Sequence, residues 1–182
     1  MTAPATPLSS PPTPPTPPTP SMGVPPAAVA LVKRFEGFAK QVKRSTPVTA
    51  VPYLCPAGFW TIGYGHLCTP AHPAITEGEA EVYLAQDLIA ARSATLRLCP
   101  VLIHEPEHRL AAIIDFTFNL GAGRLQTSTL RVRINQRNWT EAARELRRWV
   151  HGGGKVLPGL VLRRDINARY LLGSDLSIRS VA

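Results

Sequence analysis

The chain has 182 residues, 45% of them hydrophobic, which is enough for one compact domain with a substantial core. Its formal charge of +8 favours an anionic partner, such as nucleic acid, an anionic membrane or an acidic wall polymer. No run approaches the roughly 18 apolar residues of a membrane span, and no ordinary secretory signal is evident. The three cysteines show no CxxC spacing, which argues against a zinc site. We predict no metal and no cofactor.

Residues 1–25 form a separate region that contains the repeat PPTPPTPPTP and no charged side chain. Proline removes backbone donors and restricts φ, so this region is expected to be polyproline II or disordered, as a leader or tether. We expect the folded domain to span residues 26–172 and residues 173–182 to form a loose tail.

Residues 26–44 carry apolar side chains at three- and four-residue spacing, which predicts a helix. Glu36 lies on or beside that apolar stripe. One interpretation is a glutamate at the edge of the buried face. The other is a general acid, because a carboxyl against an apolar wall retains its proton.

A loop is predicted for residues 45–52, between two prolines, and a β-ribbon for residues 53–66 (YLCPAGFWTIGYGH). The ribbon is predicted to turn near Ala57 and Gly58. It concentrates three side chains capable of chemistry, Cys55, Thr61 and His66. Cys55 and Thr61 are six residues apart, which in a regular strand puts them on one face, but a turn between them makes this parity a weak guide.

The rest of the chain is predicted to be helical. Thr76 and Glu79 form a capping-box pattern before a helix that runs to about Leu98. Further helices are expected at 105–120, 127–137, 139–150 and 158–172, the first of them so apolar that we place it at the domain centre. The expected fold class is α+β, mostly helical, with one small β-ribbon.

Several motifs in this order resemble those of the phage-type lysozymes, the muramidase endolysins of lambdoid and T-even phages. They are RFEG, then Y-x-C with GFWTIGYGH, then ITEGEAEVYLAQDL, DFTFNLGAGRLQTSTL, NWTEAARELRRW and GGGKVLPGLVLRR. The resemblance covers about residues 26–172. It implies a lysozyme-like fold with a β-ribbon lobe, a helical lobe and an active-site cleft between them.

The resemblance also implies hydrolysis of the β-1,4 bond between N-acetylmuramic acid and N-acetylglucosamine in peptidoglycan. The family's catalytic Glu, Asp or Cys, and Thr correspond to Glu36, Cys55 and Thr61. A glycosidase needs an acid on the leaving oxygen and a second group on the opposite face of the sugar. We expect Glu36 to be the acid and Thr61 to bind the attacking water, with Cys55 orienting or activating it and inversion as the outcome. A covalent route through a Cys55 thiolate is the less favoured variant.

Two features depart from the family pattern. Cys55 is the rarer choice at its position, and a thiol with a pKa of about 8.5 is mostly protonated at neutral pH. The separation of 19 positions between Glu36 and Cys55 is also longer than usual, with residues 43–52 as the inserted loop.

Further residues are candidates for support or binding. The resemblance implies that His66 pairs with Asp87 and that this pair stabilises the fold. It also implies that Asn119 reaches the floor of the cleft, and the alternative for Asn119 is that it only caps its helix. Arg163 or Arg164 is expected beside Glu36, with solvent exposure as the alternative. Cys68 and Cys99 are expected to be free or a facultative pair.

The expected partner is therefore bacterial peptidoglycan and not nucleic acid. Transient contact with an anionic membrane is left open. The protein itself is expected to be a monomer. The expected location is the host cytoplasm, with release to the cell wall through a holin-type pore and host lysis as the result. Two alternatives remain: a lytic transglycosylase and a non-catalytic basic wall-binding module.

Overall fold

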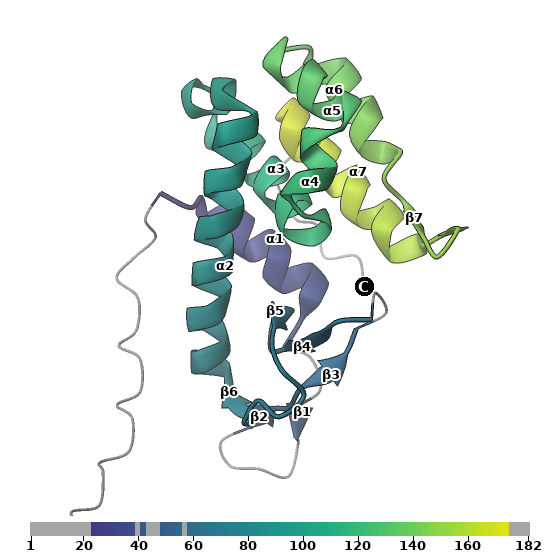
Figure 1. Ribbon diagram of the computed structural model, residues 1–182. Coiled ribbons are helices and arrows are strands. Elements are labelled where there is room, and N and C mark those ends of the chain that lie inside the picture. The colour runs from purple at the N-terminus through teal and green to yellow at the C-terminus, as the bar shows by residue number, and fades with distance from the viewer. Residues whose placement is uncertain (1–22, 39–40, 43–47, 56–57, 175–182) are drawn as a thin grey trace, which may run out of the picture.

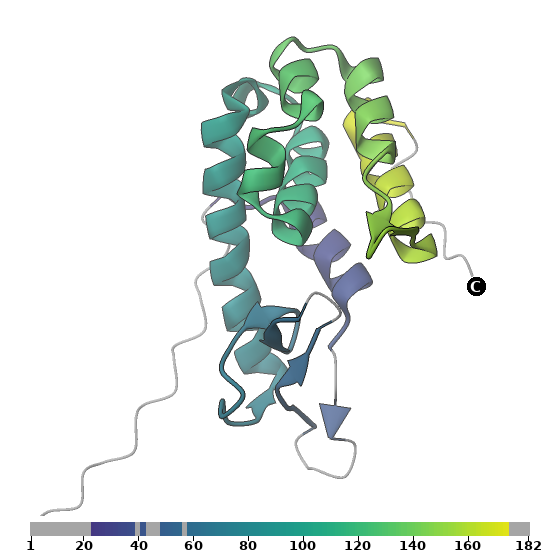
Figure 2. The ribbon, with the colours of Figure 1, turned by 45° about the vertical axis from the view of Figure 1, so that its right-hand side comes forward.

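The long helix α2 (Glu77–Leu98) runs through the computed structural model from one lobe to the other (Figure 1). Short strands gather at its beginning, and helices α3 to α7 gather near its end, as the rotated view in Figure 2 also shows. The structure describes residues 23–38, 41–42, 48–55 and 58–174. The predicted leader and tail lie almost wholly outside these residues. The lysozyme-like, mostly helical α+β fold is confirmed.

The helices and strands follow one another along the chain with short connections. The other helices are α1 (Pro26–Glu36), the 3-10 helix η1 (Pro100–His104), α3 (Glu107–Leu120), α4 (Ala122–Gln126), α5 (Thr129–Asn135), α6 (Trp139–Arg147) and α7 (Pro158–Leu172). The strands are β1 (Gln41–Val42), β2 (Thr49–Ala50), β3 (Tyr53–Leu54), β4 (Trp60–Ile62), β5 (His66–Leu67), β6 (Ile75–Thr76), β7 (His151–Gly152) and β8 (Lys155–Val156). They form antiparallel sheets in the orders β1-β2-β6, β3-β4-β5 and β7-β8.

Helix α3 lies at the centre of the helical lobe, as predicted. Every residue from Leu110 to Thr117 is buried, and α3 packs against α1, α2 and α7. The capping box that starts α2 is also confirmed, since Thr76 Oγ1 accepts from the Glu79 backbone N–H at 3.3 Å and Glu79 Oε2 accepts from the Thr76 N–H at 2.7 Å. These two helices fix the frame onto which the strands and α7 pack.

The first helix is shorter than predicted. It ends at Glu36 because Gly37 takes a φ of 63°, in the left-handed region that glycine adopts without a steric penalty. Glu36 is therefore the last residue of α1 and not a mid-helix residue. The end of α1 projects its carboxyl toward the neighbouring elements.

Three other segments differ from their predicted boundaries. The segment predicted as a loop over 45–52 contains strand β2, which pairs with β1 and β6, so the lobe holds more than one ribbon. Residues 127–137 form α5 only in part, and α4 precedes it. Helix α6 ends at Arg147, so Trp149 and Val150 lie beyond it, and the glycine run after them forms the β7–β8 hairpin. Strand β2 depends on a distant partner, β6, whereas α5 begins at a local cap, where the Ser128 side chain accepts from the Arg131 N–H.

Candidate active site

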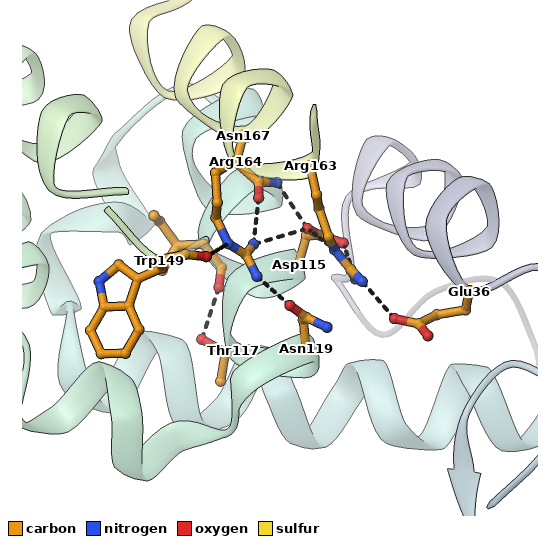
Figure 3. Close-up of polar contacts among 9 residues, drawn as sticks. Glu36, Asp115, Thr117, Asn119, Trp149, Arg163, Arg164 and Asn167 are labelled. Carbon is orange, nitrogen blue, oxygen red and sulfur yellow. Dashed lines mark hydrogen bonds and ion pairs between the residues drawn. The ribbon is translucent and has the colours of Figure 1, made fainter. Parts of the chain in front are cut away.

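The carboxylate of Glu36 contacts helix α7 from the end of α1. Arg163 Nη1 donates a hydrogen bond of 2.6 Å to Glu36 Oε1, across 127 positions of sequence (Figure 3). The Arg163 side chain is only 4% exposed, and Glu36 is 24% exposed. The prediction that an arginine lies beside Glu36 is confirmed for Arg163, and the alternative of solvent exposure is wrong for both Arg163 and Arg164.

Asp115 of α3 binds the other edge of the Arg163 guanidinium. Its Oδ2 accepts from Nε at 2.9 Å and its Oδ1 from Nη2 at 2.7 Å. Asn167 also donates to Asp115 Oδ2, at 2.9 Å. Asp115 is fully buried, and sequence reasoning missed it. The available signal was an ionisable residue between Ile114 and Phe116 in the most apolar helix, because such a residue needs a buried cation as a partner.

The second arginine of α7 binds a different set of groups. Arg164 donates to Asn119 Oδ1, to Asn167 Oδ1 at 2.8 Å, and to the Trp149 carbonyl at 3.3 Å. Because Asn119 Oδ1 accepts from Arg164, the Asn119 amide directs its NH2 donor elsewhere, and Figure 3 shows that nitrogen on the side of Glu36. Asn119 is partly exposed at the end of α3.

Burial and charge act in opposite directions on these two arginines. Burial lowers the pKa of Arg163, but the hydrogen bonds and charge of Asp115, together with Glu36, outweigh it and raise the pKa overall. For Arg164 burial dominates and lowers the pKa to about 10 despite the Asp115 charge. Both side chains are cations at neutral pH, and Asp115 is their shared buried counter-ion.

The register of the ribbon settles the parity of Cys55 and Thr61. Tyr53 pairs with Thr61 and Leu54 with Trp60, and the Cys55 N–H donates to the Phe59 carbonyl at 2.9 Å. Cys55 therefore follows β3 directly, two residues after Tyr53, the partner of Thr61. Continued strand alternation puts its side chain on the face of Thr61, as a diagonal neighbour. Thr61 is buried, with Oγ1 3.4 Å from the Tyr53 carbonyl oxygen, and Cys55 is half-buried. The predicted turn residue Ala57 lies outside the described residues.

The segment that follows β4 approaches the carboxylate. A Cβ added to Gly65 would lie 3.6 Å from Glu36 Oε2, the oxygen that Arg163 does not bind. From Gly65 a pocket of about 350 Å³ extends between the ribbon and the helices. Its walls include His66, Leu67, Asp87, Ala91, Phe118 and Ala122. A hollow of similar size between α1 and α2 is lined by Val29 and Leu88 among others. Glu36 is not among the lining residues of either space, and Gly65 is its link to the first one.

His66 and Asp87 are in contact, as predicted. The ring Nδ1 lies 2.9 Å from Asp87 Oδ2, and the ring stacks on Tyr83 with the centroids 4.3 Å apart. This contact joins the ribbon to α2, directly after Gly65. It therefore supports the wall of the pocket.

The remaining sequence predictions concern thiols, metals and membranes. Cys55, Cys68 and Cys99 are all free thiols, and burial raises the pKa of Cys99 to about 12. Within the described ranges, no three His, Cys, Asp or Glu residues come together as a metal site would require. No helix in the described part of the chain is long and apolar enough to cross a membrane.

The protein has a strand lobe and a helical lobe that are joined by one long helix, and the Glu36 carboxyl lies where elements of both lobes meet. This arrangement is that of a lysozyme-like protein. The muramidase domain of SpmX from Asticaccaulis excentricus has this fold, with a TM-score of 0.67 and 28% identity over 82% of this chain and 97% of that one. The phage lysozyme family model matches residues 33–167, so the chain belongs to the phage lysozyme family.

Curated relatives are endolysins. The endolysin of Bacillus phage B103 is 33% identical over 146 residues, which are 79% of this chain and 52% of that protein. The SAR-endolysin of Bacteriophage PS119 is 36% identical over 118 residues, or 63% of this chain and 69% of that protein. The chain thus spans about half the length of the B103 endolysin.

Proposed function

We propose that this protein is a peptidoglycan hydrolase, an N-acetylmuramidase that cleaves the β-1,4 bond between N-acetylmuramic acid and N-acetylglucosamine. The observation that carries the proposal is that the two oxygens of the Glu36 carboxyl have different surroundings. One oxygen accepts from Arg163, and the other lies on the side of Gly65, a residue that lines the pocket. Membership of the phage lysozyme family supports the substrate class.

In the proposed reaction Glu36 is the general acid. In its neutral form Oε1, as the carbonyl oxygen, accepts from Arg163, and Oε2 carries the proton. Oε2 protonates the glycosidic oxygen as the bond to the anomeric carbon breaks, and the leaving sugar departs as an alcohol. Glu36 regains a proton from solvent after each turnover.

The second group of the reaction is a water molecule on the opposite face of the sugar. We propose that Thr61 and Cys55, which share one face of the ribbon, bind and orient this water. A neutral thiol contributes a hydrogen bond and no charge. The water therefore attacks the anomeric carbon directly, releases one proton to solvent as the new C–O bond forms, and inverts the anomeric configuration. Asn119 is proposed to bind the substrate, offering its NH2 group to a carbonyl or hydroxyl oxygen of the glycan.

The test is hydrolysis of purified peptidoglycan by the wild type, Glu36→Gln and Glu81→Gln. Glu81 is an exposed carboxylate paired with Lys33, so it is a matched control for the loss of one charge near α1. We expect loss of at least about 10³-fold in rate for Glu36→Gln with the fold retained, and no change for Glu81→Gln. Retained lysis by Glu36→Gln would remove Glu36 from the mechanism.

Mass spectrometry of the products separates the two reaction classes. Hydrolysis leaves a reducing sugar at the new end, whereas a lytic transglycosylase leaves a 1,6-anhydro end. Binding to peptidoglycan without any cleavage would favour the wall-binding module instead.

Several relatives carry the name SAR-endolysin. We propose that this chain also acts at the cell wall, in the periplasm, during host lysis, and that it crosses the membrane through a holin-type pore. Expression in a bacterial host with and without a co-expressed holin tests this route. Lysis that does not depend on the holin would contradict it.

A further inference from the structure

The polar groups behind Glu36 form a buried network centred on one residue that the proposed reaction does not use. Asp115 is fully buried and contacts three side chains of α7: Arg163, Arg164 and Asn167. All three lie at least 48 positions away in sequence. Figure 3 shows the carboxylate of Asp115 between the two guanidinium groups.

The geometry divides the Arg163 guanidinium between two carboxylates. Asp115 takes Nε and Nη2, and Glu36 takes only Nη1. A guanidinium is planar, so two parallel hydrogen bonds to one carboxylate fix its plane and its direction. The direction in which Nη1 points is therefore set by Asp115, and Nη1 in turn determines which oxygen of Glu36 Arg163 binds and which it leaves.

The charge of Arg163 is also shared between Asp115 and Glu36. Arg163 is 4% exposed and Asp115 is 0% exposed, so this ion pair has little water to screen it. Within the described residues, Arg163 binds Glu36 directly and Arg164 interacts with it through charge. Asp115 of α3 contacts both arginines, and His66, which follows Gly65, contacts Asp87. On α1 itself, Lys33 binds Glu81 of α2. Asp115 pairs with both Arg163 and Arg164, so this one carboxylate offsets part of the positive charge that the two arginines place behind Glu36.

We infer that Asp115 is a positioning residue for the proposed reaction: through Arg163 it orients Glu36, and it offsets part of the positive charge beside that carboxyl. This inference rests on the proposed function. It also assigns Oε2, beside Gly65, as the proton-donating oxygen.

The first variant is Asp115→Asn, with Asp165→Asn as its control. Asp165 is a carboxylate of α7 that pairs with Arg147 and Arg169 on the surface, so its removal costs the same formal charge. For Asp115→Asn we expect kcat to fall on the order of 10²-fold with KM little changed, because the acid is misplaced and not the binding surface. We also expect the alkaline limb of the pH–rate profile to move to lower pH, because the loss of the Asp115 charge leaves more uncompensated positive charge on Arg163 beside Glu36. Asp165→Asn should retain the wild-type profile.

A second variant distinguishes orientation from simple charge balance. The double substitution Asp115→Asn with Asn167→Asp exchanges the carboxylate and the amide within one hydrogen-bonded pair. It restores the buried negative charge beside Arg164, which Asn167 already contacts, but not the two hydrogen bonds to Arg163. We expect the thermal stability to recover while kcat stays low and the alkaline limb stays displaced.

The outcomes separate the two proposals. A wild type that does not cleave peptidoglycan refutes the proposed function. An active wild type with an unchanged rate and pH profile in Asp115→Asn refutes the positioning role. Recovery of the full rate by the double variant, or failure of both variants to fold, would make Asp115 a structural counter-ion and also refute it.

Discussion

Glu36 uses its two oxygens differently, and that division determines what can be tested at single residues. Oε1 accepts from Arg163, while Oε2 lies where a Gly65 side chain would begin. Gly65 has a φ of 89°, a conformation that glycine adopts readily and other residues adopt at a cost. The absence of a side chain at Gly65 keeps the space beside Oε2 open on the side of the pocket that Gly65 lines.

We predict that Gly65→Ala is largely inactive. The new methyl group would occupy the space 3.6 Å from Oε2, where the proposed glycosidic oxygen must approach. The control is Gly154→Ala in the β7–β8 hairpin, which has a φ of 77° and no atom within 4 Å of an added Cβ. Both variants should lose about 1 kcal/mol of stability, but only Gly65→Ala should lose activity, on the order of 10²-fold. Equal activity of the two variants would contradict the access argument.

Cys55 provides a second prediction at this scale. Cys55→Ser retains a group that donates and accepts hydrogen bonds, so we expect partial activity. Cys55→Ala leaves the proposed water with Thr61 alone, so we expect much less. The measurement is the initial rate of peptidoglycan clearing, with Cys68→Ala as the control because Cys68 packs against the core. Wild-type rates for both Cys55 variants would show that the thiol is incidental.

The elements of the helical lobe are joined by ion pairs at their ends as well as by apolar packing. Glu105, between η1 and α3, binds Arg109 one turn into α3 and Arg137 just after α5, the latter at 2.9 Å. Its side chain is only 12% exposed. Burial raises the pKa of Glu105, but the hydrogen bonds from Arg137 and Arg109 outweigh it, and the pKa is lowered overall from 4.5.

This shift predicts a pH-dependent contribution to stability. Because the folded-state pKa lies below the unfolded value, Glu105 stabilises the fold above about pH 4.5 and loses that effect as the pH falls through the folded value. Glu105→Gln should therefore be less stable than the wild type at neutral pH, and the difference should shrink at acidic pH. Urea unfolding between pH 3 and pH 7 measures it. Glu141→Gln, which breaks the surface pair with Arg144, is the control and should have little effect at any pH. A constant difference for Glu105→Gln would contradict the linkage.

At the scale of the whole molecule, the two lobes are connected by α2 and by contacts on either side of the site. Glu36 reaches α7, and the His66–Asp87 pair ties the ribbon to α2. The pocket beside Gly65 is lined by residues of the ribbon, α2, α3 and α4. A shift of either lobe would therefore change the distance between the proposed acid and the proposed water-binding face.

The net charge of +8 gives a prediction at the same scale. A basic protein associates faster with an anionic wall, and salt screens that attraction. We expect KM for whole peptidoglycan to rise with ionic strength while kcat changes little. A short, uncharged glycan substrate is the control and should show a much weaker dependence. The same salt response for both substrates would exclude electrostatic association as its cause.

The sequence by itself determined the helical frame and the chemical candidates. The capping box at Thr76, the apolar run of α3, and the residues Glu36, Cys55 and Thr61 were all readable, because helix caps, periodicity and motif spacing are local properties of the chain. It did not determine where α1 ends or that residues 49–50 form a strand. Those depend on the conformation of Gly37 and on pairing with Ile75 and Thr76.

Only the tertiary structure decided which groups surround the proposed acid. The contact between Glu36 and Arg163 spans 127 positions, and Asp115 meets Arg163 across 48. No periodicity encodes such pairings, since they arise when α1, α3 and α7 pack together and a buried charge must find a partner. The identity of the Glu36 oxygen that Arg163 leaves depends on that packing as well, and so could not be read from the order of the residues.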